Sequence, residues 1–197
     1  MKWKVINNFL SPQQANFLYQ YALLAVKRHE HLEKYHQKRF DENIYGTRTD
    51  GQVNGAFSLY GDLVFDTLLK EKLKDVESQF GKRLIENYSY VRVYQKGNEL
   101  KRHRDRFSCE VSLTVCLGYD SQRPWPIYID GDQIILEPGD ALAYKGQDAE
   151  HWRETFDGNT QAQVFLHYND IDSNTVKYDG RPELGLPGKY KNGHRNS

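Results

Sequence analysis

The chain has 197 residues, of which 38% are hydrophobic and 27% charged, a composition typical of one folded domain and not of a disordered segment. Acidic and basic residues are equal in number, 27 each, and no long basic stripe is present, which disfavours nucleic acid as a partner. No run of about 18 apolar residues exists, so we expect no membrane association. The two cysteines form no CxxC pair, which predicts a reduced, cytoplasmic protein.

The first part of the chain predicts a short strand and two helices. Trp3 to Phe9 has the pattern of an extended entry segment. A serine and a proline then start a helix that apolar residues at helical spacing extend from about Pro12 to Lys34. A second buried stripe predicts a helix from about Gly61 to Phe80. Between the helices, Arg39 to Phe57 is polar and contains glycines, and we expect a loop or weak strand pair there that covers a substrate site.

From Tyr88 onward the hydrophobic period changes from helical to two. Tyr88 to Tyr94 and Glu110 to Leu117 each place aliphatic side chains on one face and polar or aromatic side chains on the other. Ile127 to Leu136 predicts a hairpin with an Asp-Gly turn, and shorter strands are expected at Ala141 to Tyr144 and Gln161 to Tyr168. The sequence therefore predicts a mainly β fold with flanking helices, in which an antiparallel barrel carries two N-terminal helices on its outside.

The regular pattern ends near residue 172. Residues 173–197 are rich in glycine, proline, asparagine and basic residues and have little apolar surface to bury. We therefore expect a single domain over residues 1–172 and a poorly ordered tail, or one that lies on a partner, over residues 173–197.

Three side chains with metal-binding chemistry flank the predicted strands. His103 and Asp105 project to the same side of an extended segment, about 7 Å apart at ~3.3 Å per residue. His151 follows at the far end of the strands and can supply a third ligand. Two imidazoles and one carboxylate leave coordination positions open, which suits Fe(II) that must bind a chelating co-substrate and dioxygen. His-x-Asp alone is common by chance, so the hypothesis depends on the order of the surrounding strands.

Five segments follow one another in a fixed order: YVRVYQKG at 90–97, HRD at 103–105, EPGD at 137–140, HWRE at 151–154 and QVFLHY at 163–168. With these motifs in this order, the sequence resembles the 2-oxoglutarate and Fe(II)-dependent dioxygenases, specifically the branch similar to prolyl 4-hydroxylases, over residues 84–170. It implies a double-stranded β-helix, or jelly-roll, core. It also implies that His103, Asp105 and His151 ligate iron, with 2-oxoglutarate and dioxygen as co-substrates and ascorbate as a candidate reductant.

One departure from the family concerns the far carboxylate of 2-oxoglutarate. The family pairs this group with an Arg or Lys about ten residues after the second histidine, where this chain has TQAQ at 160–163. An anion without a partner in a cavity is costly, so another donor is needed. Arg153 faces the same side of a strand as His151 and can form two hydrogen bonds with a carboxylate, so we expect it first and Lys145 second. The alternative for Arg153 is a structural ion pair with Glu154 or Glu110.

Neutral side chains are expected to add to this pocket. Tyr94, Thr114 and Gln163 are candidates for hydrogen bonds to the co-substrate. Arg92 shares a face with Tyr94 and is a candidate contact for co-substrate or substrate, with a role in lining the core as the alternative. His167 is expected to be structural, because the metal set is complete without it.

The resemblance implies that the protein hydroxylates a C–H bond, with a protein or peptidyl-proline substrate as the first expectation and a small molecule as the second. Asp105 favours hydroxylation over halogenation, since halogenases of the family lack the carboxylate. The alternatives are a jelly-roll module that binds a metal or ligand without catalysis, and a cupin-like enzyme that does not use 2-oxoglutarate. A third alternative, an oxidative demethylase of nucleic acid, is disfavoured by the neutral charge.

Overall fold

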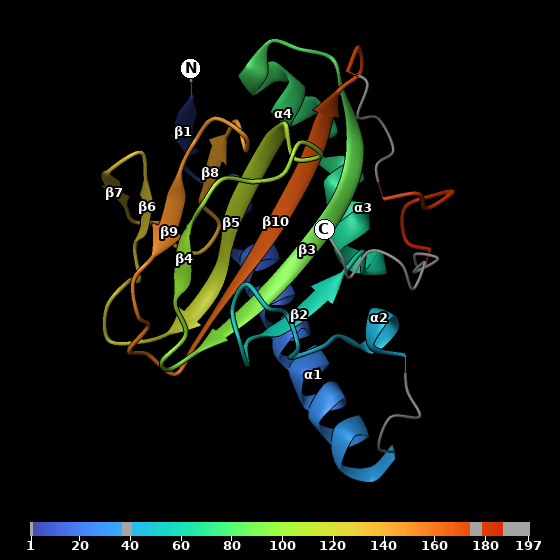
Figure 1. The fold of residues 1–197 in the computed structure, drawn as a ribbon, viewed down its shortest axis with the longest axis vertical. Helices are drawn as coiled ribbons and strands as arrows, with labels where there is room; N and C mark the ends of the chain where they lie inside the picture. The colour runs from blue at the N-terminus through green and yellow to red at the C-terminus, as the bar shows by residue number, and fades with distance from the viewer. Residues whose placement is uncertain (1, 37–40, 174–178, 187–197) are drawn as a thin grey trace.

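Two antiparallel sheets form the centre of the computed structural model, which describes residues 2–36, 41–173 and 179–186 (Figure 1). The larger sheet has the strand order β1 (Trp3–Ile6), β8 (Ala141–Tyr144), β5 (Val111–Asp120), β10 (Thr160–Asp170), β3 (Leu84–Gln95) and β2 (Phe57–Tyr60). The smaller sheet has the order β4 (Leu100–His103), β9 (His151–Arg153), β6 (Ile127–Ile129) and β7 (Asp132–Ile134). The predicted two-sheet jelly-roll core is confirmed.

The central strands of the larger sheet have one aliphatic face and one polar or aromatic face, as their alternation predicts. On β5, Leu113 and Val115 belong to the hydrophobic cluster beneath the helices. Thr114 and Cys116 alternate with them, and Cys116 packs against Ile127 of the smaller sheet. The core therefore has two layers, one between helices and sheet and one between the two sheets. The second layer is where polar side chains can meet.

The helices α1 (Pro12–His36), α3 (Leu63–Glu71) and α4 (Leu73–Phe80) cover the outer face of the larger sheet, where they contact β3 and β5 (Figure 1). The first predicted helix is confirmed, and the second is divided at Lys72, which ends α3 and begins α4. Gly81 ends α4 in the left-handed conformation, with φ at 63°. Within the described residues, no helix has the length and apolar character that crossing a bilayer requires.

The segment predicted as a loop between the helices contains the short helix α2 (Glu42–Tyr45) and ends at β2. The first two residues of this segment, 39 and 40, lie outside the described part of the chain. The strand β2 pairs with β3, and it is too short for alternation to reveal it. Gly46 begins the loop that follows α2 with φ at +87°, and a side chain there would come within 2.3 Å of the Phe57 ring. Glycine is therefore required where the chain turns toward the sheet.

Part of the C-terminal tail lies against the domain. Residues 179–186 are described, and the buried Arg181 pairs there with Asp66 of α3 and with Asp179, at 2.6 and 2.5 Å. The two ion pairs of Arg181 hold this segment, although it has little apolar surface to bury. Residues 174–178 and 187–197 lie outside the described residues, so the expectation for them stays a prediction.

Candidate metal centre

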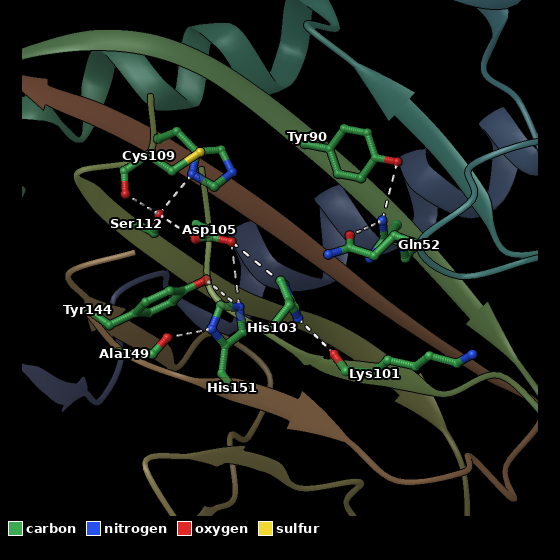
Figure 2. A network of polar contacts seen from close by, with 12 residues as sticks. Gln52, Tyr90, Lys101, His103, Asp105, Cys109, Ser112, Tyr144, Ala149 and His151 are labelled. Carbon is green, nitrogen blue, oxygen red and sulfur yellow. Dashed lines mark hydrogen bonds and ion pairs between the residues drawn. The ribbon is translucent and has the colours of Figure 1, made fainter. Parts of the chain in front are cut away.

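His103, Asp105 and His151 converge at one end of the smaller sheet (Figure 2). His103 ends β4 and His151 begins β9, and the two strands pair with these residues directly opposite each other. The Nε2 atoms of both histidines lie 3.7 Å from Asp105 Oδ1. One ligand atom from each of the three residues lies within 4.8 Å of the others. These separations allow a single cation to contact all three side chains at about 2.1 Å with small rotations.

Backbone carbonyls orient both imidazoles. His103 Nδ1 lies 2.8 Å from the carbonyl oxygen of Lys101, and His151 Nδ1 lies 3.1 Å from that of Ala149. An Nδ1–H that donates to a carbonyl leaves the lone pair on Nε2, the atom that faces Asp105. Burial lowers the pKa of His151, which favours the neutral imidazole. Both histidines are thus held in the form that metal ligation requires.

A cavity of about 470 Å³ opens beside these three residues. Its other walls come from the loop before β2, from the strands β3, β4, β8 and β10, and from the connection between β4 and β5. These walls include aromatic side chains, cations and a thiol: Asp50, Gln52, Tyr88, Tyr90, Arg92, Leu100, Arg104, Arg106, Cys109, Tyr144, Phe165 and His167. The volume is in the range of pockets that hold a small ligand.

Arg153 is buried deeper in the barrel, two residues beyond His151 on β9, with 2% of its surface exposed. Its Nη1 donates to the carbonyl of Trp125 at 2.7 Å, and its Nη2 has no hydrogen-bond partner. Among the described residues no carboxylate pairs with it, so the expected alternative, an ion pair with Glu154 or Glu110, is not formed. Burial lowers the pKa of Arg153, as expected for a cation that lacks an anion.

Neutral donors surround this guanidinium. Thr114 Oγ1 donates to Gln163 Oε1 at 3.1 Å, which leaves the buried Nε2 of Gln163 without a partner. The thiol of Cys116 interacts with both Gln163 and Arg153. The Tyr94 phenol lies near Arg153, and its ring packs edge-on against Trp125 at 5.0 Å. Two buried donors without partners among the described residues, Arg153 Nη2 and Gln163 Nε2, therefore belong to side chains that both lie beside Cys116, and a carboxylate is a group that could satisfy both donors.

Comparison with known proteins gives similarity at the level of structure. No family model matches the sequence, and no curated protein matches it. A prolyl-4-hydroxylase of Pseudomonas putida superposes with a TM-score of 0.58 at 13% identity, over 86% of this chain and 92% of that chain. The 2-oxoglutarate complex of a collagen prolyl hydroxylase of Paramecium bursaria Chlorella virus-1 gives 0.62 at 12% identity, over 87% and 97%. The α-ketoglutarate-dependent carbocyclase SnoK of nogalamycin biosynthesis gives 0.63 at 13% identity, over 94% and 88%.

The chain has the fold of the 2-oxoglutarate and Fe(II)-dependent oxygenases. The resemblance that the motifs indicated is therefore supported by the three-dimensional structure. In this fold the three expected metal ligands come together, and Tyr94, Thr114 and Gln163 are buried on β3, β5 and β10.

Two expected cations of the co-substrate pocket have other environments. Lys145 is exposed and lines a separate groove with Gln147 and Asp148, because it follows the last residue of β8 and turns away from the barrel. Arg92 is buried on the cavity wall, but it is already paired with Asp50, and its Nη2 donates a hydrogen bond to Gln52 Oε1 at 2.8 Å. Arg153 is thus the better candidate for the co-substrate, and Lys145 does not reach the site.

Several cavity residues were not expected from the sequence. Ser112 donates to Asp105 Oδ2 at 3.0 Å and lies 2.9 Å from His167 Nδ1, so His167 belongs to the cavity wall and to the surroundings of the triad. The alternation of β5, which places Ser112 on the same face as Thr114, is a signal that could have identified it. Asp50 comes from a loop without periodicity, and nothing local predicts that it reaches Arg92.

Proposed function

We propose that the protein is a 2-oxoglutarate-dependent non-haem Fe(II) dioxygenase that hydroxylates a C–H bond. The observation that carries this proposal is the buried Arg153 guanidinium, which has an unsatisfied Nη2 and no carboxylate partner among the described residues. It lies two residues beyond the candidate metal ligand His151, a step of about 7 Å along a strand. A dicarboxylate of sufficient length could bind a metal held by the triad with one end and the Arg153 guanidinium with the other.

His103, Asp105 and His151 would hold Fe(II), which together with 2-oxoglutarate supplies the activation of dioxygen. Arg153 and Gln163 would bind the far carboxylate through donors that have no partner in the described part of the chain. The Trp125 ring lies 4.8 Å from the Arg153 guanidinium and excludes water, which strengthens the attraction between guanidinium and carboxylate. A cupin-like enzyme or a metal-free binding module has no need of this buried cation.

For the substrate we propose protein-bound or peptidyl proline first. Two of the structures with this fold are named prolyl hydroxylases, and the cavity wall contains Tyr88, Tyr90 and Phe165, whose rings suit a small apolar ring. The carbocyclase with the same fold shows that this architecture also serves other reactions on small molecules. The substrate therefore needs its own test.

The co-substrate assignment is tested by anaerobic addition of Fe(II) and 2-oxoglutarate, which produces a visible charge-transfer band when 2-oxoglutarate chelates the iron. We expect the band in the wild type and no band in Asp105→Ala. In Arg153→Ala we expect the band only at about 30-fold higher 2-oxoglutarate, equivalent to ~2 kcal/mol for the loss of one partner of a buried charge pair. Arg153→Lys should recover part of the affinity.

Lys145→Ala is the matched control, because Lys145 is an exposed cation outside the pocket, and its titration should equal that of the wild type. A wild type that gives no band contradicts the proposed chemistry. A titration of Arg153→Ala that equals the wild type contradicts the role of Arg153.

The substrate class is tested by succinate release from 2-oxoglutarate in the presence of proline-containing peptides or of pools of amino acids and other small molecules. We expect peptides to stimulate succinate release and to gain the mass of one oxygen atom. Stimulation by the small-molecule pool alone contradicts a peptidyl-proline substrate and leaves the oxygenase chemistry intact.

A further inference from the structure

A second group of metal-binding side chains adjoins the first. One ligand atom each of Asp105, Cys109 and His167 lies within 4.8 Å of the others. Cys109 lies in the connection between β4 and β5, and His167 lies on β10. Both side chains line the same cavity as the triad, so an ion that enters the cavity can reach them. The proposed dioxygenase chemistry uses neither Cys109 nor His167.

One oxygen of Asp105 faces the triad histidines, and the other accepts a hydrogen bond from Ser112, which lies beside the second group (Figure 2). Its Oδ1 lies 3.7 Å from Nε2 of both His103 and His151. Its Oδ2 accepts a hydrogen bond from Ser112 at 3.0 Å, and the Ser112 hydroxyl lies 2.9 Å from His167 Nδ1. A carboxylate whose two oxygens point to separate donor sets can bind one cation with each oxygen. The two groups therefore do not compete for the same atom.

Close packing keeps Asp105 and Cys109 together. A side chain on Gly146 would lie 2.2 Å from the backbone oxygen of Cys109 and 2.8 Å from Asp105 Oδ2, so the connection is pressed against this glycine. The backbone N–H of Asp105 donates to the carbonyl of Gly146 at 2.9 Å. The Tyr88 hydroxyl lies 3.1 Å from Cys109 Sγ and holds the thiol at the cavity wall. The cluster is thus placed by the fold and not by flexible side chains alone.

We propose that Asp105 Oδ2, Cys109 and His167 form a second cation site, selective for a thiophilic divalent ion such as Zn²⁺. Thiolate, imidazole and carboxylate are the ligands that Zn²⁺ takes in proteins, at about 2.0–2.3 Å. The triad of His103, Asp105 and His151 contains no sulfur and suits Fe(II). Binding would exchange the hydrogen bonds of Ser112 and Tyr88 for metal bonds to Asp105, His167 and Cys109.

Titration of the metal-free protein with Co²⁺ tests this site, since Co²⁺ bound to a thiolate gives a near-ultraviolet charge-transfer band that nitrogen and oxygen ligands do not give. Equilibrium dialysis measures the number of bound ions in parallel. We expect two bound Co²⁺ ions and a thiolate band in the wild type. Cys109→Ser keeps a hydroxyl beside Tyr88 and should bind one Co²⁺ ion without the band.

Two control variants isolate the second site. Cys116→Ala removes the other cysteine of the chain, which lies outside the cluster, and should retain the band. His103→Ala removes one triad ligand and should lose one Co²⁺ ion but retain the band, so a failure of the iron site is distinguished from a failure of this one. A wild type without a thiolate band overturns the proposal and leaves the cluster as a hydrogen-bond network that positions Asp105. A band that survives in Cys109→Ser also overturns it.

Discussion

Asp50 and Arg92 form the ion pair that closes one side of the cavity. Arg92 is buried on β3, and Asp50 reaches it from the loop between α2 and β2. The Tyr90 hydroxyl donates to the same carboxylate at 2.5 Å. Burial by itself would raise the pKa of Asp50, but Arg92 and Tyr90 outweigh it, so the pKa is lowered from 3.8. The ionised carboxylate therefore holds the loop over the cavity.

The pair should make stability depend on pH in the acid range. The pKa of Asp50 is lower in the folded protein than in the unfolded chain. The contribution of this carboxylate to the free energy of unfolding is therefore present above pH 3.8 and is lost as pH falls through the lowered pKa. Asp50→Asn should lower the free energy of unfolding by about 2 kcal/mol at neutral pH, less than the ~3–5 kcal/mol of a fully buried pair, because the Asp50 side chain is 20% exposed. Urea unfolding at several pH values measures both. Equal stability of variant and wild type at pH 7 would contradict this role.

Asp62 joins two helices and begins one of them. Its carboxylate accepts a hydrogen bond from the backbone N–H of Val64 at 3.0 Å, which caps α3. The other oxygen accepts a hydrogen bond from the Tyr21 hydroxyl of α1 at 2.7 Å. One side chain thereby fixes the start of α3 and its position relative to α1 on the outer face of the sheet.

Asp62→Ala should lower the free energy of unfolding by about 2 kcal/mol, as the sum of a lost cap and a lost hydrogen bond of ~1 kcal/mol each. Asp62→Asn retains the cap and should cost less. Tyr21→Phe removes only the contact between the helices and should cost about 1 kcal/mol. Chemical denaturation followed by circular dichroism measures all three. A loss in Tyr21→Phe as large as that in Asp62→Ala would contradict the capping role.

Across the whole molecule, the C-terminal segment is tied to the barrel by Arg181. Its guanidinium pairs with Asp66, and Asp66 Oδ1 also accepts a hydrogen bond from the Ser89 hydroxyl of β3 at 2.6 Å. A side chain at Gly61 would lie 2.3 Å from the guanidinium, so glycine makes room for it. Tail, helix and sheet thus meet at one buried charge pair on the outside of the cavity wall.

Arg181→Met should lower the free energy of unfolding by about 3–5 kcal/mol, because it leaves the Asp66 carboxylate buried without its cation. Adding Asp66→Asn to this variant removes the remaining charge and should recover part of the loss. Thermal unfolding of the two variants measures the difference. A double variant less stable than Arg181→Met would contradict this explanation.

By itself the sequence determined the periodicities of the strands and identified the candidate metal ligands of this protein. Alternation along the strands at 88–94 and 111–117 showed which side chains share a face, because the strand period is a local property of the chain. His103 and Asp105 are close in the sequence, and the order of the motifs indicated His151 as the third candidate ligand.

Only the tertiary structure decided which polar groups are paired. Arg153, Lys145 and Arg92 were all candidates. Nothing in their local sequence shows that Arg153 has no carboxylate partner among the residues that the structure describes, that Lys145 faces solvent or that Arg92 is paired with Asp50. The same holds for the tail, where Arg181 finds its partner 115 residues away. The residue type gives the charge of a side chain, but the partner of that charge depends on which distant segments the packed sheets bring together.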